Sequence, residues 1–404
     1  MSPRVIADLA AIRQLQFSDL PRANQELLEF FRQRLPFGVR SVEIRPLAVS
    51  LNSINGFLEL EDGRRKLFFK AHIESQVADR EYYNTEVLAE AGYPILKPVL
   101  KATESAAQHV MLYEIVESPT MFDACRAVEV GTASNADDLI AAQERSDRQL
   151  LGLYRRSLRW AEAAEHARSP IHQLFFHRLT GGRYDQFYRG QSVRLPGGID
   201  MLFEDFATLR WTINDVPYPG TLDELMDRAI RLLNPAQAGP VIAGHGDAHN
   251  GNVFFPKPDG ELLYFDPAFA GYHSPFLDLV KPLYHNVHAQ WMYFPEETSR
   301  DLTVTIDLTG GVAYVRHDYP VTPIRRATKR SKTELVLRPM VEDLGRRGWL
   351  YAEWKAYMQS ALMCCPLLTM NLCDTEKFPD NVRLLGFAHA IVAGHEDPLP
   401  ERPA

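Results

Sequence analysis

The sequence contains few cysteines for its length. Four of its 404 residues are cysteine, namely Cys125, Cys364, Cys365 and Cys373. No two of them form a C-x-x-C pair, and the adjacent pair has poor geometry for a mutual disulfide. This small number excludes a disulfide scaffold for a chain of this size and favours a reducing compartment.

Long hydrophobic runs are also missing. The longest apolar stretch, SALMCCPLLTMNLC, is too short and too polar to cross a bilayer. The first residues, MSPRVIADLAAIRQLQ, lack the apolar centre of a secretory signal. We therefore expect a cytoplasmic protein without a membrane partner.

Positive charge is in deficit. Lysine and arginine together number 44, against 52 aspartates and glutamates, so the formal net charge is -8. Because nucleic-acid binding requires a basic surface, we expect no nucleic-acid partner. The 46% of hydrophobic residues is ordinary for a soluble globular protein, and the length allows a two-lobed enzyme with a large core.

The first part of the chain predicts a small unit of strands and helices. Residues 5–34 have helical spacing, and residues 41–71 read as strands joined by an Glu-Asp-Gly turn. A helix is predicted over residues 76–91, followed by strands up to residue 116.

After this unit the pattern becomes mainly helical. Helices are predicted over residues 136–166 and 221–233, and again from residue 349 towards the end. Residues 301–318 instead predict a β-hairpin that turns at Gly310-Gly311. A basic run follows this hairpin, comprising Arg325, Arg326, Lys329, Arg330 and Lys332.

A polar stretch between two apolar segments carries the candidate chemistry. The sequence GPVIAGHGDAHNGNVFF offers His245, Asp247 and His249 as zinc ligands. Alternating residues of an extended segment point to opposite faces, however, and the helical H-E-x-x-H arrangement is absent. A zinc-dependent hydrolase that uses this cluster is therefore an alternative reading.

The spacing of the polar residues fits phosphoryl transfer better. Asp247 precedes Asn252 by five residues, and Asp266 ends the next predicted strand. Protein kinases have the same order: an Asp that accepts the substrate proton, then an Asn and a second Asp that bind Mg²⁺. An antiparallel hairpin would bring Asn252 and Asp266 to one end, and their oxygens suit Mg²⁺.

The segments HGDAHNGN, LLYFDPAFAG and FLDLV, within residues 241–282, resemble the aminoglycoside phosphotransferase and choline kinase-like superfamily. The resemblance implies an α+β, bilobal protein kinase-like fold. A small β-rich lobe would cover residues 1–117 and a larger, mainly helical lobe residues 118–404. The larger lobe would contain the catalytic loop, 243–254, and a β-hairpin insertion, 301–338.

The resemblance also implies cofactors and residue roles. ATP, or another nucleoside triphosphate, and Mg²⁺ would be the cofactors, and a hydroxyl of a small molecule would be the acceptor. Asp247 would be the catalytic base, and Asn252 and Asp266 the metal ligands. His245 and Asp278 would brace the catalytic loop from inside.

A lysine and a glutamate of the smaller lobe complete the implied catalytic set. Lys70 follows the apolar residues of RRKLFFKAH, which favours a cleft, and the resemblance assigns it to the α- and β-phosphates. Its partner would be Glu81 or Glu86 of the following helix. Glu81 is favoured because similar proteins place the acid about two turns before the last buried leucine, here Leu88.

Four further residues belong to the predicted nucleotide site. Ser50 and Asn52, in VSLNSINGF, could donate hydrogen bonds to phosphates, although relatives have more glycine there. The backbone groups of Glu114 and Ile115, in the connection MLYEIVES, would meet adenine.

Two questions stay open from the sequence. A kinase fold that binds ligands without turnover is a further alternative, although the complete set of Lys70, Asp247, Asn252 and Asp266 argues against it. The identity of the acceptor is also open. We expect the 301–338 insertion to form a lid or a homodimer contact beside the acceptor site, with its basic residues favouring a carboxylate or phosphate on the acceptor.

Overall fold

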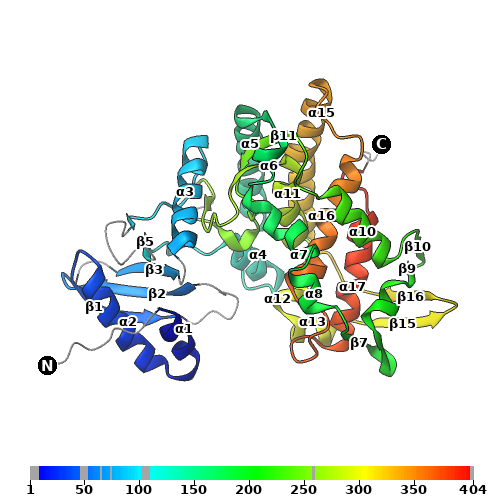
Figure 1. Cartoon of the computed structure of the whole chain (residues 1–404), viewed down its shortest axis with the longest axis horizontal. Coiled ribbons are helices and arrows are strands. Elements are labelled where there is room, and N and C mark those ends of the chain that lie inside the picture. Colours follow the sequence, from blue (N-terminus) through cyan, green and yellow to red (C-terminus); the bar gives the residue numbers. More distant parts are fainter. Residues whose placement is uncertain are drawn as a thin grey trace.

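The computed structural model has two lobes of unequal size (Figure 1). Three predicted site groups lie outside the described part of the chain: Ser50, Asn52 and the side chain of Glu81. The structure describes residues 9–45, 53–63, 66–72, 75–101, 110–256 and 260–400, without the side chains of 72, 75–82, 100 and 101.

A five-stranded antiparallel sheet forms the smaller lobe, in the order β1-β2-β3-β5-β4. The central strand β3 carries Lys70, which lies opposite Asn55 of β2 and Met111 of β5. The middle of a sheet is its most rigid part, so the backbone position of this lysine is fixed. The strands are β1 (Val39–Ile44), β2 (Ser53–Leu60), β3 (Lys66–His72), β4 (Leu100–Lys101) and β5 (Val110–Glu114).

Three helices accompany this sheet. The helices α1 (Leu9–Ser18) and α2 (Leu20–Arg34) cover one face, where the rings of Phe31 and Phe69 meet edge to face at 5.0 Å. Helix α3 (Ser75–Ala91) stands between the sheet and the larger lobe (Figure 1). The sheet and the first two helices therefore share a core of their own, separate from that of the larger lobe.

The larger lobe is built mainly from helices, with α16 and α17 packed along each other in its middle (Figure 1). No helix of the described ranges is long and apolar enough to span a bilayer. The helices are α4 (Met121–Glu129), α5 (Ala136–Ser157), α6 (Ala163–His166), α7 (Phe176–Leu179), α8 (Arg183–Phe187), α9 (Phe203–Ala207), α10 (Leu222–Leu232), α11 (Pro275–His285), α12 (Gln290–Tyr293), α13 (Pro295–Asp301), α14 (Pro323–Lys332), α15 (Arg338–Arg346), α16 (Trp354–Thr369) and α17 (Asp380–His395).

Small sheets complete the larger lobe, in the orders β10-β9-β16-β15, β14-β11-β6, β12-β13 and β7-β8. The helix predicted over residues 136–166 ends at Ser157, because the chain then enters β6 and pairs antiparallel with β11. The strands are β6 (Arg159–Ala161), β7 (Ser192–Leu195), β8 (Ile199–Leu202), β9 (Arg210–Ile213), β10 (Val216–Tyr218), β11 (Gly239–Gly244), β12 (Val253–Phe254), β13 (Leu263–Tyr264), β14 (Gly271–His273), β15 (Val304–Thr309) and β16 (Val312–His317).

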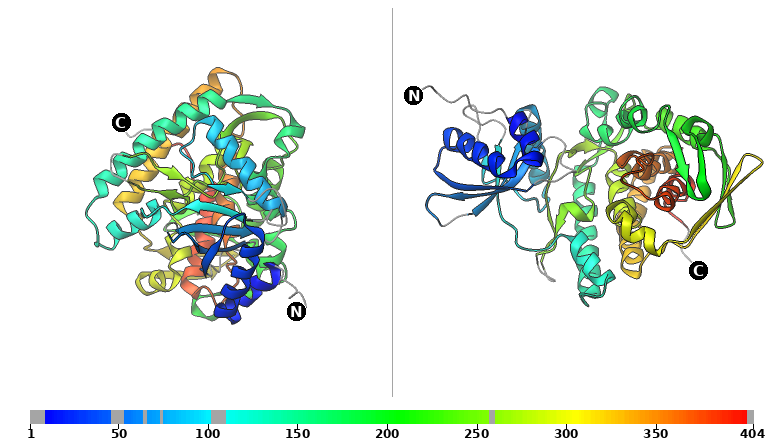
Figure 2. Two further views of the ribbon diagram at one scale, coloured as in Figure 1. Left: turned by 90° about the vertical axis from the view of Figure 1, so that its left-hand side faces the viewer. Right: turned by 90° about the horizontal axis from the view of Figure 1, so that it is seen from below.

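The predicted hairpin is present, and its expected role as a lid or a homodimer contact beside the acceptor site stays a prediction. Strands β15 and β16 turn at Gly310-Gly311, and β16 then pairs in parallel with β9, with Ala313 opposite Trp211. Figures 1 and 2 show this sheet at the end of the helical lobe that is farthest from the smaller lobe. The hairpin is thus part of a four-stranded sheet.

The basic run after the hairpin forms α14, and two of its five cations, Arg325 and Lys332, are buried and not available to an anionic acceptor. Both pair with carboxylates of neighbouring helices. Arg325 Nη2 lies 2.8 Å from Glu129 Oε2, and Lys332 Nζ lies 2.5 Å from Asp147 Oδ1. All four side chains are almost completely buried, so these charges hold α14 against α4 and α5.

We predict that Lys332→Met lowers the free energy of unfolding by about 3–5 kcal/mol, because it leaves Asp147 buried without a counter-charge. Adding Asp147→Asn should recover part of this loss, since the amide is neutral and can keep the hydrogen bond from Ser331 Oγ, now 2.6 Å long. Urea denaturation of both variants measures the effect. Lys329→Met, which removes a partly exposed pair with Glu396, is the control and should cost less than about 1 kcal/mol.

Candidate active site

The predicted metal-binding residues meet at one end of a short hairpin. Strand β12 pairs with β13 so that Val253 lies opposite Tyr264. The amide of Phe265 donates to the carbonyl oxygen of Asn252 at 3.1 Å, which places Asn252 beside the start of the Asp266 segment. The hairpin therefore brings these two residues together from the two ends of one short segment of the chain.

Asp278, at the start of α11, holds the loop that precedes this hairpin. Its Oδ1 accepts hydrogen bonds from the amide of Gly246 at 2.5 Å and from His273 Nε2 at 2.9 Å, and its Oδ2 accepts one from the hydroxyl of Tyr154. Gly246 has a φ of +80°, and a Cβ there would lie 2.5 Å from the carbonyl oxygen of Phe269. The turn into the loop therefore requires glycine.

The environment of Asp278 keeps it ionised. Burial alone would raise the pKa of this carboxyl, but hydrogen bonds and positive charge from His273, with hydrogen bonds from Tyr154 and Gly246, lower the pKa below its ordinary value. The carboxylate is thus a fixed, charged acceptor beneath the loop.

We predict that Asp278→Asn lowers the free energy of unfolding by about 3 kcal/mol near neutral pH, since it removes a charged acceptor of three hydrogen bonds. Because the folded pKa is lower than the unfolded one, this carboxylate stabilises the fold above an unfolded pKa of about 3.9. That contribution is lost as the pH falls through the folded pKa. Denaturant titrations at about pH 7 and at about pH 2.5 should show a smaller difference between wild type and variant at the lower pH; an unchanged difference would contradict the assignment.

The two histidines of the loop are engaged by other groups. His245 Nε2 lies 2.9 Å from the carbonyl oxygen of Phe265. His249 Nδ1 accepts from the amide of Gly251 at 3.1 Å, and its ring stacks on that of His285. Over the described ranges, no three His, Cys, Asp or Glu residues are grouped so that they could hold a metal ion. The zinc-hydrolase alternative therefore lacks a ligand cluster there.

Asp247 presents a carboxylate oxygen that lacks a hydrogen bond. Its Oδ1 is buried and accepts no hydrogen bond from the described residues, and Lys281 Nζ forms an ion pair with it at 3.7 Å. Asn252 Nδ2 donates to the carbonyl oxygen of Asp247 at 2.9 Å, so the amide oxygen of Asn252 remains available. A buried acceptor without a donor is costly and is expected where a substrate group binds.

Two contacts tie the lobes together at this point. Lys70 Nζ lies 2.8 Å from Asp266 Oδ1, and Asn84 of α3 donates to the carbonyl oxygens of Pro267 and Ala268 at 3.0 and 3.3 Å. Asp266 itself has a φ of +56°, a conformation that Asp and Asn tolerate better than most residues. The strained backbone thus points its carboxylate toward the lysine of the opposite lobe.

The predicted adenine-binding residues lie in the link between the lobes. Glu114 is the last residue of β5, opposite Leu67 of β3, and Ile115 begins the connection to α4. The amide of Phe255 donates to the carbonyl oxygen of Pro119 at 2.9 Å, which fixes the far end of this connection.

Glu86 was the second candidate for the acid that pairs with Lys70. Its side chain is half-buried on α3 and forms no ion pair with the described residues.

Sequence reasoning missed two residues of the site, Asn84 and Lys281. Lys281 had a signal, because it interrupts the apolar helical run FLDLVKPLYH three residues after Asp278.

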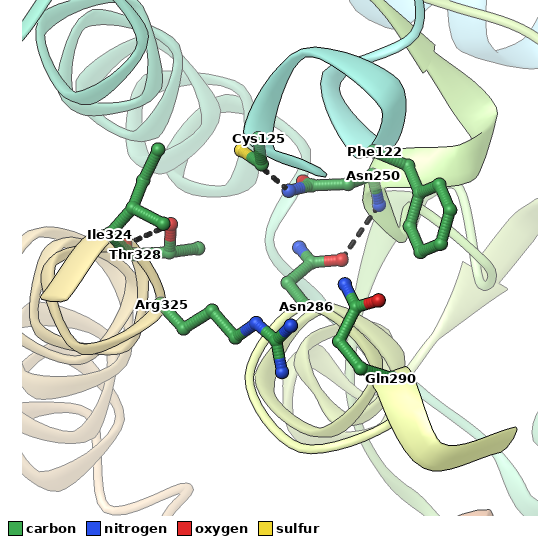
Figure 3. A pocket seen from close by; sticks show the side chains of 8 residues that line it. All are labelled: Phe122, Cys125, Asn250, Asn286, Gln290, Ile324, Arg325 and Thr328. Atoms are coloured by element: carbon green, nitrogen blue, oxygen red, sulfur yellow. Dashed lines mark hydrogen bonds between the residues drawn. The ribbon is translucent and has the colours of Figure 1, made fainter. Parts of the chain in front are cut away.

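A small cavity behind the catalytic loop is too small for a substrate. Figure 3 shows Asn250 between Cys125 and Asn286: its amide donates to Asn286 Oδ1 at 2.7 Å, and its Nδ2 lies 3.8 Å from Cys125 Sγ. The volume is about 10 Å³, room for a single water, and Gln290 Oε1 on its wall is buried without a partner. The cavity therefore belongs to the support of the loop.

The fold is the predicted class, an α+β protein with two kinase-like lobes. No protein-family model and no curated protein matches the sequence. Solved structures that resemble it include an ethanolamine kinase of Plasmodium vivax, at 10% identity over 98% of this chain and 96% of that one, with a TM-score of 0.49.

Two further solved structures are phosphotransferases. A macrolide 2'-phosphotransferase type I has 11% identity over 91% of this chain and 96% of its own, with a TM-score of 0.41. A spectinomycin phosphotransferase in complex with ADP and spectinomycin has 14% identity over 91% of this chain and 98% of its own, with a TM-score of 0.39. At these identities and scores no residue role is transferred from them.

Proposed function

We propose that the protein is an ATP- and Mg²⁺-dependent phosphotransferase that moves the γ-phosphoryl group of ATP to a hydroxyl of a small molecule. The observation that carries this proposal is the juxtaposition of four polar groups in the cleft. Asp247 presents a buried oxygen that lacks a hydrogen bond, Asn252 and Asp266 lie at one end of a hairpin, and Lys70 reaches Asp266 from the other lobe at 2.8 Å. Phosphoryl transfer requires groups of these types in this order.

The oxygen donors at the hairpin suit Mg²⁺. Asp266 offers a carboxylate, and Asn252 offers its amide oxygen because its nitrogen donates to a backbone carbonyl. Mg²⁺ usually takes one or two ligands from protein and the rest from phosphates and water, so two donors are enough. When bound, the ion would neutralise negative charge on the phosphates.

Asp247 would act on the acceptor. In the proposed step the acceptor hydroxyl donates to Asp247 Oδ1, and its oxygen attacks the γ-phosphorus. The proton passes to the carboxylate, and the bond between the γ-phosphorus and the bridging oxygen breaks, which releases ADP. Lys70 would bind the α- and β-phosphates, with Glu81 as its partner.

The remaining assignments are part of the same proposal. The backbone of Glu114 and Ile115 would bind adenine, and Ser50 and Asn52 would donate to phosphates. His245 and Asp278 would brace the loop. The lobes would divide at residues 117 and 118.

A screen of hydroxyl compounds tests the proposal. Purified protein with ATP and Mg²⁺ should release ADP in the presence of one class among antibiotics, sugars, amino alcohols and hydroxy acids. Restoration of activity by zinc but not by magnesium after chelation would favour the hydrolase alternative. Binding of Mg-ATP without turnover of any acceptor, and without slow hydrolysis of ATP by water, would favour the silent binding protein.

A further inference from the structure

A second, larger cavity lies against α11. Its volume is about 190 Å³, and its walls come from α11, α14, α16 and α17, together with β16 and the segments that follow β16 and α17. Lys281 and His285 form one row along α11 and contact the catalytic loop, whereas Tyr284 and His288 form a neighbouring row and line the cavity. None of the described residues predicted to carry out phosphoryl transfer lines it, so the cavity is separate from the candidate active site.

His389 of α17 offers a hydrogen-bond donor to this cavity. Trp291 Nε1 donates to His389 Nδ1 at 3.2 Å, and an indole N–H can only donate, so the imidazole proton is on Nε2. This Nε2 has no hydrogen-bond partner among the described residues, yet it keeps accessible surface although the whole residue is only 8% exposed. Because the cavity is the space that this buried ring borders, the Nε2–H group is available to a ligand there.

His317 of β16 supplies a second donor of the same kind. The amide of Tyr319 donates to His317 Nδ1 at 3.3 Å, which again leaves the proton on Nε2 without a partner among the described residues. The ring centroids of His317 and His389 are 5.9 Å apart, so one small molecule can reach both. Burial lowers the pKa of both imidazoles, which are therefore neutral near pH 7.

Much of the remaining wall is apolar or aromatic. It consists of aliphatic side chains and two tyrosine rings: Leu283, Leu362, Val392, Ala393, Tyr284 and Tyr319. The ring of Tyr319 lies 5.4 Å from that of His389 at an angle of 72°, and ring edges and faces of this kind favour a flat aromatic guest. Since an apolar cavity of about 150 Å³ accommodates benzene, the volume here suits a single ring with a short substituent.

The charged side chains at the cavity already have partners. Lys329 Nζ lies 2.8 Å from Glu396 Oε1, and Asp397 Oδ2 lies 2.6 Å from Lys355 Nζ. Burial lowers the pKa of His288 to about 4, so this residue is also uncharged near neutral pH. An ion would therefore enter a poorly hydrated space without a free counter-charge among the described residues, which is costly.

We infer that this cavity is a second binding site, and that its ligand is a small neutral ring compound that carries a carbonyl or a similar hydrogen-bond acceptor. The ring would pack on the aliphatic and tyrosine side chains, while the acceptor takes a hydrogen bond from Nε2–H of His389 or His317. This inference goes beyond the proposed function and does not depend on it, because binding here involves no group of the cleft.

Four benzene derivatives that differ in one substituent test the chemical class of the ligand: benzamide, benzoate, benzylamine and toluene. In ligand-observed NMR titrations, benzamide should bind at least about tenfold more tightly than benzoate or benzylamine, and about fivefold more tightly than toluene. Absence of benzamide binding, or equal affinity for all four compounds, overturns the inference. Toluene that binds as tightly as benzamide overturns the role of the histidine donors.

A cavity-filling variant tests the location. Ala393→Phe should weaken the binding of benzamide and toluene at least about tenfold, because the new ring occupies their space. Ala352→Phe, at an exposed alanine, is the matched control and should bind both compounds like the wild type. Circular dichroism checks that each variant is folded, and equal benzamide affinity in a folded Ala393→Phe overturns the inference.

A donor-removing variant keeps the test valid if Ala393→Phe does not fold. His317→Phe retains a ring on the partly exposed strand β16 but loses the N–H group, so it should weaken benzamide binding about fivefold and leave toluene binding unchanged. His177→Phe, at an exposed histidine of α7, is its control and should alter neither. An unchanged ratio of the two affinities in His317→Phe contradicts the assignment of this donor.

A competition measurement separates this site from the cleft. Benzamide should bind equally well to the free protein, to the protein with excess Mg-ADP and to Asp247→Asn. Loss of benzamide binding in the presence of Mg-ADP would place the ligand in the cleft and overturn the inference. ADP release in the acceptor screen remains the readout of the proposed function, so either proposal can fail without the other.

Discussion

Asp247→Asn should lower the rate of phosphoryl transfer by about a thousandfold, while the affinity for Mg-ATP stays within a few fold of the wild type. The amide has the size and shape of the carboxylate but cannot take up the proton of the acceptor hydroxyl. Because Asp247 Oδ1 accepts no hydrogen bond from the described residues, the structural support that the substitution removes is the ion pair with Lys281 Nζ at 3.7 Å. Steady-state ADP release and calorimetric titration with Mg-ATP measure the two effects.

A matched control for this variant is Asp227→Asn, an exposed residue of α10. It should have wild-type turnover and stability. If Asp247→Asn retained near-normal turnover of the true acceptor, Asp247 would not be the catalytic base. A loss of Mg-ATP affinity comparable to the loss of turnover would place Asp247 at the nucleotide instead.

Asp266→Asn should weaken Mg-dependent binding of ATP by at least about tenfold and reduce turnover still further. The variant removes the charge that would hold the ion and that now pairs with Lys70 at 2.8 Å. Asparagine is preferable to alanine here because it tolerates the φ of +56° at this position, so the effect reports charge and not backbone strain.

Titrations with ATP in the presence of Mg²⁺ and in the presence of a chelator separate the metal role from a general effect on the cleft. The variant should lose the difference between the two titrations. If Mg²⁺ strengthened ATP binding equally in the variant and the wild type, Asp266 would not be a metal ligand.

The part of the site that could be predicted from the sequence is the part that is local in the chain. The spacing of Asp247, Asn252 and Asp266 follows from one loop and one hairpin, whose turn and strands are visible in the sequence. The lysine on β3 followed from its apolar neighbours and from the resemblance.

What could not be predicted depends on contacts between distant segments. The basic run after residue 322 suggested an exposed surface, because nothing local shows that Arg325 and Lys332 have their partners in Glu129 and Asp147. The hairpin likewise gave no sign of its pairing with β9.

The separate cores of the two lobes have a consequence for how the chain folds during synthesis. Every buried member of the smaller core lies between Leu9 and Leu112, so that core is complete early. The larger core extends to Ile391, and β9 cannot gain its parallel neighbour until β16 has been made. Pairings between distant segments form slowly, so we expect the first lobe to be compact while β9, paired only with β10, still lacks the half of its sheet that β15 and β16 supply.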